Sequence, residues 1–280
     1  MSNFSLQLSD QFRAHPQAKK QLVKLLHKGQ SELVKDSADQ PISIVIRVRN
    51  EAATLKALLA SIQGQTYTQP IQIIVVDNES TDDSVQIAKQ HGATVVTLKK
   101  AEFTYPKSMN LGAAQAIHPL LLEMVGHALP AHNYWLRAGV RHFADTKVAG
   151  TYGCPVANNR TRWLDGLFRY IELRWYRPYT AKITKTRTSV LGAHNCIIRT
   201  VLWQQHPFDE RYEAGGEDTA WANWALERGL VIIRDPIFSV HHSHGQKTLG
   251  FIKQVRAYTK MKSPQPITKM SNQRKSHFTR

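Results

Sequence analysis

Three groups of polar residues stand where the sequence predicts that a strand ends or a helix begins. Asp77 and His127 each follow a short apolar run, and Gly215-Gly216-Glu217-Asp218 precedes a helical pattern. Carboxylates and imidazoles are the side chains that most often move protons or bind metals. Ligands of open α/β sheets bind at the carboxyl ends of the strands, so these groups predict one shared cleft.

Each group also has an interpretation that needs no ligand. Asp77 can accept hydrogen bonds from a base N–H or a ribose hydroxyl, but residues 77–83 also suit a turn followed by a helix cap. In His241-His242-Ser243-His244, alternate side chains of an extended segment point the same way. His242 and His244 can therefore converge on a metal or a phosphate, or can simply form a polar strand end. Residue type and spacing leave these alternatives open.

Short apolar runs alternate with helical patterns from residue 41 onwards, which is typical of a sheet covered by helices on both faces. The expected strands are 42–48, 71–76, 94–98, 120–124, 193–199, 231–233 and 237–240. The expected helices are 51–63, a helix capped by Ser80 or Thr81 that ends at Gly92, 107–117 and 217–228. We therefore expect an α/β domain whose polar groups are positioned by strand and helix ends.

The pattern divides the chain into three parts. Residues 1–40 are expected to be an N-terminal helical extension, because apolar residues recur there with helical spacing before a polar break. Residues 41–261 are expected to form the main domain, with a nucleotide-binding type of half at 41–130 and a second half at 131–261. Residues 262–280 lack an apolar period and contain two prolines, and we expect a basic, disordered tail.

Charge and composition narrow the class of protein. The formal net charge is +16, and no acid follows Asp235 whereas nine Lys or Arg residues do. Such a basic arm can bind anionic lipid, nucleic acid or a diphosphate, or serve only solubility. No apolar run is long enough to span a bilayer, and residues 1–40 lack the apolar core of a secretory signal. We expect a cytoplasmic protein with two reduced cysteines, Cys154 and Cys196.

Four motifs follow one another along the expected sheet. They are IVIRVRNE at 44–51, VVDNESTD at 75–82, the segment 107–112 and Gly216-Glu217-Asp218. In this order and at these spacings they resemble the family 2 glycosyltransferases, and the resemblance covers about residues 41–245. It implies the GT-A fold, a Rossmann-like mixed sheet flanked by helices. It also implies that 41–130 binds a nucleotide sugar and that 131–261 binds the acceptor.

The resemblance implies roles for the residues at matching positions. The candidates for the nucleotide-sugar site are Arg47, Arg49, Glu51, Asp77, Lys107 and Gly126. Family members usually carry a small or apolar residue, and often a proline, where Arg47 and Val48 stand. The two arginines therefore depart from the family pattern. They either contact the diphosphate or indicate that the nucleotide carries a different base. Lys107, with Arg49, is expected to meet the negative charge that develops on the leaving diphosphate.

The same resemblance places the catalytic base in the second half of the chain. Asp218 is the expected base for the acceptor hydroxyl, and Glu217 is expected to orient that acceptor. A helix N-terminus favours the ionised form of a carboxyl group and lowers its basicity somewhat. Acids in a first turn also complement the helix dipole without doing chemistry, which is the structural alternative for this pair.

The metal motif of the family is changed in this chain. Asp-X-Asp is common at the position of Val125-Gly126-His127, so both carboxylates are missing. Some family members resemble this chain in having His there, followed soon by Pro, as Pro130 does here. The resemblance therefore implies a divalent metal held by His127 with His242 or His244. Imidazole ligands suit Mn²⁺ better than Mg²⁺.

The resulting prediction is an inverting glycosyltransferase of the hexosyl or deoxyhexosyl type, active in polysaccharide biosynthesis. Its partners would be a nucleotide diphosphate sugar and a saccharide or lipid-linked acceptor. Basic residues within 160–187 and after Asp235 would hold it on the anionic inner face of the membrane. One alternative is a nucleotide-sugar-binding protein of the same fold with reduced catalysis. Another is a nucleic-acid-binding protein, which no recognised readout motif supports and which we do not expect.

Overall fold

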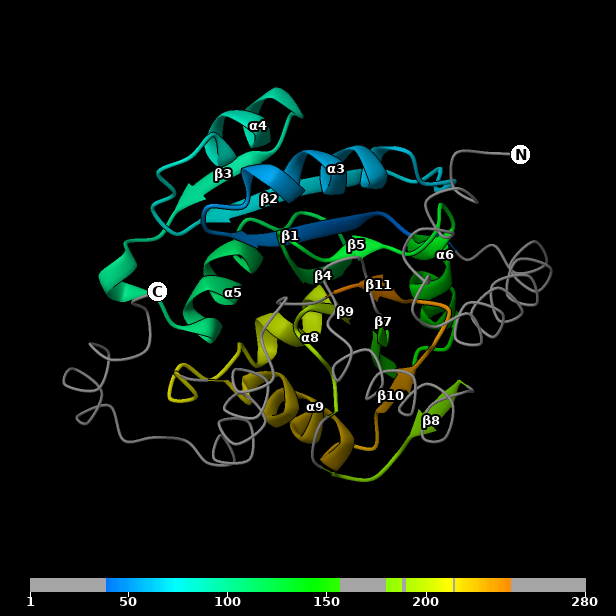
Figure 1. Ribbon diagram of the computed structural model, residues 1–280. Coiled ribbons are helices and arrows are strands. Elements are labelled where there is room, and N and C mark those ends of the chain that lie inside the picture. The colour runs from blue at the N-terminus through cyan, green and yellow to red at the C-terminus, as the bar shows by residue number, and fades with distance from the viewer. Residues whose placement is uncertain (1–38, 157–179, 188–189, 214, 243–280) are drawn as a thin grey trace.

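The computed structural model describes residues 39–156, 180–187, 190–213 and 215–242 (Figure 1). Residues 1–38 of the expected N-terminal extension, His244, the tail at 262–280 and most of the basic stretch at 160–187 lie outside this part. The strands are β1 Ile42–Val48, β2 Ile71–Asp77, β3 Thr94–Thr97, β4 Leu120–Val125, β5 Leu129–Pro130, β6 Val148–Tyr152, β7 Pro155–Val156, β8 Ala181–Ile183, β9 Asn195–Arg199, β10 Val231–Arg234 and β11 Val240–His241. The helices are α3 Ala52–Gln63, α4 Ser84–Gln90, α5 Tyr105–Ala113, α6 Trp135–Val140, α8 Thr200–Gln205 and α9 Glu217–Glu227, with short 3-10 turns at Lys100–Glu102 and Arg141–Ala144.

The described part is built on one large mixed sheet. Its eight strands have the order β3-β2-β1-β4-β9-β6-β10-β8, and a small second sheet has the order β5-β11-β7. The strands β1 to β4 are parallel neighbours, whereas β9 runs antiparallel to both β4 and β6. The mixed sheet flanked by helices that the sequence predicts is therefore confirmed.

Helices cover both faces of the large sheet, and side-chain alternation explains how (Figure 1). Ile42, Ile44 and Ile46 of β1 are fully buried in a core shared with Leu55 and Leu59 of α3. Val45 belongs to the opposite core, together with residues of α5 and α9. Because successive side chains of a strand point to opposite faces, one apolar strand supplies both cores. Arg47 therefore shares the α5 and α9 face with Val45.

Most of the expected elements are confirmed, and the differences have local causes. The helix after β2 begins at Ser84 rather than after Ser80 or Thr81, because those residues bond to the loop after β1. The helix expected at 107–117 is α5, Tyr105–Ala113, which begins earlier because the Thr104 hydroxyl accepts the Lys107 N–H at 3.2 Å. The strand expected at 237–240 is only the two-residue β11. In the described ranges no helix has the length and apolarity needed to cross a bilayer.

Candidate active site

The carboxyl ends of β1, β2 and β4 lie side by side at one edge of the sheet. Val48 pairs with Asp77, and Arg47 lies opposite the last residue of β4. Backbone bonds hold the following loops to β1, from the Asn78 N–H to the Val48 carbonyl at 2.9 Å and from the Gly126 N–H to the Arg47 carbonyl at 3.0 Å. Three adjacent strands therefore form the edge at which an α/β sheet binds its ligand.

Asp77 and Asn78 carry buried oxygens that the described residues leave without a hydrogen bond. Asp77 is 3% exposed and Asn78 is 5% exposed. The Asp77 Oδ2 accepts the Ser80 N–H at 3.2 Å, whereas Asp77 Oδ1 and Asn78 Oδ1 have no partner in the described part. Buried polar oxygens are nearly always hydrogen-bonded. These two acceptors are suited to the N–H or O–H donors of a ligand.

The loop after β1 is fastened to the loop after β2, a feature that the sequence did not reveal. Asn50 has a positive φ of 54°, a conformation that Asn adopts more readily than most residues. Its N–H donates to the Ser80 hydroxyl at 2.9 Å, and its side-chain oxygen accepts the Thr81 N–H at 2.8 Å. The Ala52 N–H donates to Asp82 at 3.0 Å. The polar residues of both motifs thus fix the two loops relative to each other.

Glu51 and His127 are brought into direct contact, although they lie 76 residues apart. The Glu51 Oε1 lies 2.7 Å from the His127 Nδ1, and the Thr54 hydroxyl donates to the other Glu51 oxygen at 3.0 Å. Gly126 permits this approach, because a Cβ there would stand 3.1 Å from the Glu51 Cγ. Glu51 therefore orients the imidazole at the position of the changed metal motif.

His127 also stands in a column of imidazole rings. The ring centroids of His127 and His242 are 5.0 Å apart, and those of His242 and His194 are 5.2 Å apart, with planes inclined by 20° and 24°. Two of the three expected metal ligands are therefore neighbours. No three His, Cys, Asp or Glu residues of the described ranges are grouped so that they hold a metal ion. A divalent ion here would need oxygens of a bound diphosphate to complete its coordination.

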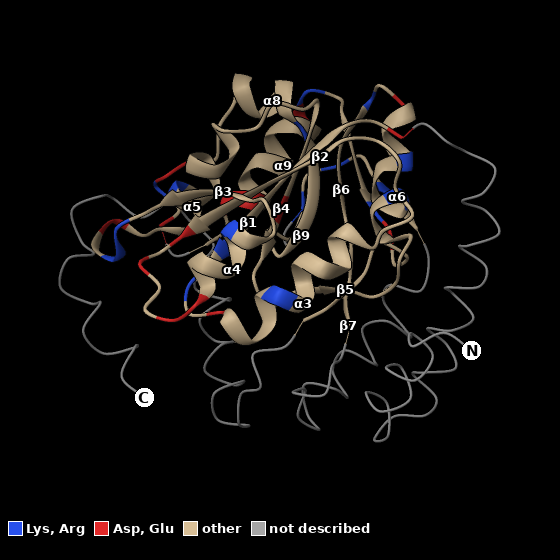
Figure 2. Ribbon diagram, turned by 90° about the horizontal axis from the view of Figure 1, so that it is seen from above, with Lys and Arg blue, Asp and Glu red and all other residues tan. Residues whose placement is uncertain are grey.

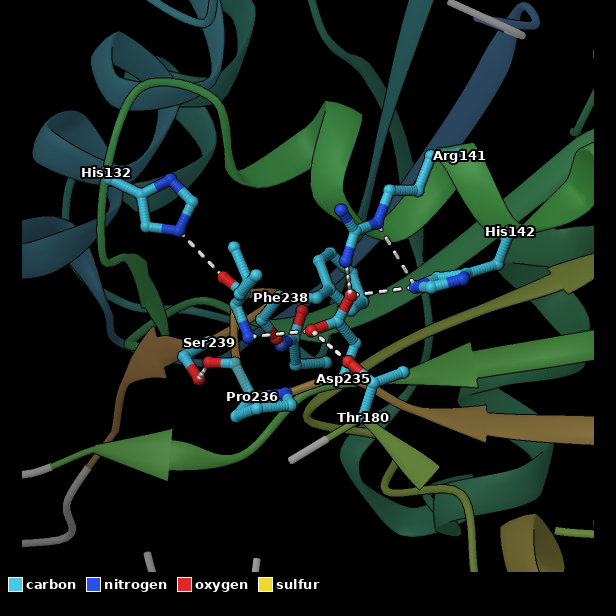
Figure 3. A network of polar contacts seen from close by, with 10 residues as sticks. His132, Arg141, His142, Thr180, Asp235, Pro236, Phe238 and Ser239 are labelled. Atoms are coloured by element: carbon cyan, nitrogen blue, oxygen red, sulfur yellow. Dashed lines mark hydrogen bonds and ion pairs between the residues drawn. The ribbon is translucent and has the colours of Figure 1, made fainter. Parts of the chain in front are cut away.

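A buried polar network shapes the corner between β10 and β11, and His242 follows β11 directly in the chain (Figure 3). Asp235 is fully buried, and its Oδ2 meets Arg141 at 2.9 Å and His142 at 2.7 Å. Its Oδ1 accepts the Ile237 N–H at 2.8 Å. Burial raises the pKa of Asp235, but the bond from His142 and the charge of Arg141 outweigh burial and hold it below its ordinary value. Asp235 is thus the ionised centre of this corner.

The helix α9 begins directly after two glycines with left-handed backbone. Gly215 has φ of 117° and Gly216 has φ of 105°, which other residues rarely adopt. This turn places Glu217 and Asp218 in the first helical turn, as the sequence predicts. The glycines are needed for the backbone conformation itself.

Asp218 is held by two backbone donors. The Ala193 N–H donates to its Oδ2 at 3.0 Å, and the Thr219 N–H donates to its Oδ1 at 2.6 Å. Burial raises the pKa of Asp218, and it outweighs the lowering by these N–H groups and by the charge of Arg47. The lowering of basicity expected at a helix N-terminus is therefore present in these N–H bonds, but burial outweighs it and the net pKa is raised.

Glu217 has only 3% of its surface exposed to solvent. Burial and the adjacent Asp218 raise its pKa to about 8, whereas Arg47 and the backbone N–H groups oppose the rise. Its Oε2 has no hydrogen-bond partner in the described part. Two adjacent acids with different surroundings suit different tasks, one ionised and one protonated.

The three cations expected near the diphosphate lie in different surroundings. Arg47 donates from Nη2 to the Ala193 carbonyl at 2.8 Å, and its guanidinium carbon lies 5.6 Å from the centroid of the Tyr105 ring. Lys107 forms a surface ion pair with Glu102 at 2.8 Å. Arg49 is half-buried directly after β1. Of these cations, Arg47 reaches the loop that binds Asp218.

A comparison with known families decides the identity of this α/β chain. The model of Glycosyl transferase family 2 matches residues 43–205, which is more than half of the sequence. The chain belongs to glycosyltransferase family 2. The resemblance drawn from the four motifs is therefore confirmed.

This chain aligns with a different share of each of two family 2 relatives. Glycosyltransferase AglE of Haloferax volcanii is 30% identical over 201 residues, which is 68% of this chain and 63% of AglE. An uncharacterized glycosyltransferase of Rickettsia prowazekii is 31% identical over 103 residues, 33% of this chain and 34% of the relative. The chain thus spans less than two thirds of the length of either relative.

Solved structures of similar architecture confirm the GT-A fold for this family 2 member. The mannosyltransferase PcManGT of Pyrobaculum calidifontis, in complex with GDP-Man and Mn²⁺, has a TM-score of 0.62 at 12% identity, over 91% of this chain and 74% of that one. The glucosyl-3-phosphoglycerate synthase of Mycobacterium tuberculosis, in complex with Mn²⁺ and UDP, has a TM-score of 0.57 at 18% identity, over 85% of both chains. At these identities the likeness concerns the fold.

Proposed function

We propose that this protein is an inverting glycosyltransferase that moves a sugar from a nucleotide diphosphate to a hydroxyl of a saccharide or lipid-linked acceptor. The observation that carries the proposal is the Asp218 carboxylate, fixed by two backbone N–H groups at the start of α9. A base with a raised pKa is better suited to take a proton from a hydroxyl near neutral pH. Because the chain belongs to glycosyltransferase family 2, a sugar transfer is the reaction that this carboxylate is proposed to assist.

The donor is proposed to bind at the carboxyl ends of β1, β2 and β4. Asp77 Oδ1 and Asn78 Oδ1, buried and without partners in the described part, are suited to accept hydrogen bonds from the nucleoside. PcManGT was solved with GDP-Man, and the mycobacterial synthase with UDP, which supports a nucleotide donor for this chain. Arg49 and Lys107 are the cations proposed to offset the negative charge of the leaving diphosphate.

The acceptor is proposed to meet the acids of α9. Asp218 accepts the proton of the acceptor hydroxyl while that oxygen attacks the anomeric carbon and the diphosphate leaves from the opposite side. One displacement of this kind inverts the anomeric configuration. Glu217, whose pKa of about 8 keeps it protonated at neutral pH, is proposed to donate a hydrogen bond that orients the acceptor.

A divalent metal is proposed at the diphosphate, with Mn²⁺ favoured over Mg²⁺ because imidazoles supply the protein ligands. Both neighbouring structures named above contain Mn²⁺. His127 and His242 would hold it from the described part, with His244 as a further candidate. When bound, the ion would neutralise charge that develops on the diphosphate.

The test of the catalytic role is Asp218→Asn, assayed with a panel of nucleotide sugars. We expect the rate of transfer to fall by about 10² to 10⁴ because the base is lost. Donor affinity should be unchanged, since the donor binds at β1, β2 and β4. Nucleotide-sugar binding is measured separately by calorimetry on the same preparation.

Near-normal turnover in Asp218→Asn would overturn the base assignment. Undetectable turnover by the wild-type protein with every donor, together with measurable nucleotide-sugar binding, would favour the alternative of a binding protein with reduced catalysis. Loss of donor binding along with activity would show that Asp218 supports the fold.

A further inference from the structure

A cluster of ionisable groups lies beneath Asp218 on the α9 face of the large sheet. Arg47 comes from β1, Glu123 from β4 and Cys196 from β9, three strands that are neighbours in the order β1-β4-β9. Glu217 and Asp218 come from the first turn of α9, and the charge of Arg47 lowers the pKa of both acids. The cluster thus contains one guanidinium, three carboxyl groups and a thiol.

Arg47 is linked to Asp218 through one residue. Its Nη2 donates to the carbonyl of Ala193 at 2.8 Å, and the N–H of Ala193 donates to the Asp218 Oδ2 at 3.0 Å. The Tyr105 ring, with its centroid 5.6 Å from the guanidinium carbon, covers Arg47 from the start of α5. Arg47 and Asp218 therefore hold Ala193 from its two backbone polar groups.

The protonation state of Glu123 determines whether the charge of Arg47 is available to Asp218. Its side chain is fully buried, and neither of its oxygens has a hydrogen-bond partner in the described part. An ionised carboxylate without hydrogen bonds is very costly to bury. Burial raises the pKa of Glu123 well above its ordinary value, against the lowering by Arg47. Burial and the absence of hydrogen bonds both favour the neutral form of Glu123. Burial also raises the pKa of the Cys196 thiol.

Among the three carboxyl groups of the cluster, Asp218 is the one whose surroundings best favour an ionised form, because oxygens of Glu123 and Glu217 lack hydrogen-bond partners in the described part. It is also the acid that receives two N–H bonds, which favour a carboxylate. The guanidinium of Arg47 is then the nearby positive charge for this carboxyl group, and both side chains are half-buried, so the opposite charge favours the ionised form of Asp218.

We propose that Arg47 is a positioning residue for Asp218 and not a ligand of the donor diphosphate. It fixes Ala193, whose N–H aims the carboxylate, and it supplies the positive charge that favours the ionised base, while Glu123 stays neutral beside it. This inference rests on the proposed role of Asp218 as the base. It gives Arg47 a different task from Arg49, two residues further on.

The test compares Arg47→Met with Arg49→Met, two identical changes at alternate positions of one segment. For Arg47→Met we expect kcat to fall about tenfold or more at pH 7, with the KM for the donor unchanged. The acid limb of the kcat profile should move up by about 1 pH unit, because a carboxylate without its nearby cation binds protons more tightly. Arg49→Met should instead raise the donor KM and leave the acid limb in place.

Two further variants separate charge from packing. Arg47→Lys keeps the charge, so we expect the acid limb to return to its wild-type position while kcat recovers only in part. Glu123→Gln imitates a neutral acid in size, so its pH profile should match that of the wild type. Thermal unfolding of each variant is recorded alongside, and Arg47→Lys serves in place of Arg47→Met if the latter does not fold.

A raised donor KM with unchanged kcat and acid limb in Arg47→Met would overturn the inference and make Arg47 a diphosphate ligand. A downward shift of the acid limb in Glu123→Gln would show that Glu123 is ionised and pairs with Arg47. That result would also overturn the inference. The proposed function fails separately: it fails if Asp218→Asn stays active. Inactive Asp218→Asn combined with normal Arg47→Met would refute only the positioning role.

Discussion

At the scale of single residues, His127 has its Nδ1 within 2.7 Å of the Glu51 carboxylate. Histidines that bind metals commonly donate their other ring N–H to a carboxylate, which fixes the tautomer and the ring orientation. The same contact directs the Nε2 edge of His127 away from Glu51. The Glu51–His127 pair is therefore arranged as a metal-binding histidine and its supporting acid would be.

This arrangement predicts that His127→Ala lowers Mn²⁺ affinity and transfer activity together. Loss of a ligand should weaken Mn²⁺ binding by at least about tenfold, and Glu51→Gln should weaken it by about 10- to 100-fold through loss of orientation. Mn²⁺ binding in the presence of a nucleoside diphosphate is measured by electron paramagnetic resonance. Full activity of the wild-type protein in excess chelator, or unchanged Mn²⁺ binding in His127→Ala, would contradict the metal site. The side chains of Arg49 and Lys107 would then bind the diphosphate without a metal.

Residue types predicted the α9 acids, but not their ionisation. A helix N-terminus alone would lower the pKa of Glu217, whereas burial beside Asp218 raises it to about 8. Glu123 was not identified because it stands inside the apolar run LLLEMV, where one acid gives no sign of its neighbours. The partners of these groups come from β1, β9 and α9, and sequence separation hides that proximity.

At the scale of elements, the corner from β10 to β11 depends on one buried carboxylate. Asp235 bonds Arg141 and His142 on one side and the Ile237 N–H on the other, and the Asn195 side chain donates to the Phe238 carbonyl at 2.7 Å (Figure 3). This corner leads into β11 and His242. The Asp235 network therefore fixes the segment of chain that immediately precedes β11 and His242.

We predict that Asp235→Asn destabilises the protein by about 3 kcal/mol at pH 7, because Arg141 then loses its buried counter-charge. The pKa of Asp235 is lower in the folded than in the unfolded state, so its contribution is complete above the unfolded pKa of about 4. It is lost as the pH falls through the lower, folded pKa. The difference between variant and wild type should therefore shrink below about pH 4.

The measurement is urea unfolding of both proteins at neutral and acidic pH. Asp145→Asn serves as the control, because Asp145 is exposed: it accepts the Lys147 N–H at 2.9 Å and meets Lys182 at 3.5 Å in a surface ion pair. We expect this variant to lose much less stability than Asp235→Asn. A constant difference between Asp235→Asn and wild type at all pH values would contradict the role of the charge.

The longer elements were predictable and the short ones were not. Runs such as Ile42–Val48 and the apolar face of α3 carry their own periodicity. The two-residue strands β5, β7 and β11 have no such pattern and form because their neighbours hold them. Gly153 illustrates this: a Cβ there would overlap the Phe238 carbonyl, a constraint between segments 85 residues apart that no local pattern shows.

At the scale of the whole molecule, charge is distributed unevenly along the chain. No acid follows Asp235, whereas nine Lys or Arg residues do, and the basic stretch at 160–187 adds more. In Figure 2 the Lys and Arg segments of the described part are scattered over several elements, among them α3 and α6. The proposed attraction to an anionic surface therefore depends on the residues after Asp235 and within 160–187.

We predict that the full chain co-sediments with vesicles containing anionic lipid but not with neutral vesicles, and that salt releases it. Each Lys or Arg near such a surface contributes roughly 1 kcal/mol, so replacing Lys269, Arg274, Lys275 and Arg280 with Gln should lower the partition coefficient by more than about a hundredfold. The matched control replaces the exposed Lys56, Lys89, Lys99 and Lys147, which removes the same net charge from the described surface. If both quadruple variants bind equally weakly, net charge alone causes the attraction. If the wild-type protein co-sediments with neither kind of vesicle, the proposed membrane binding is wrong.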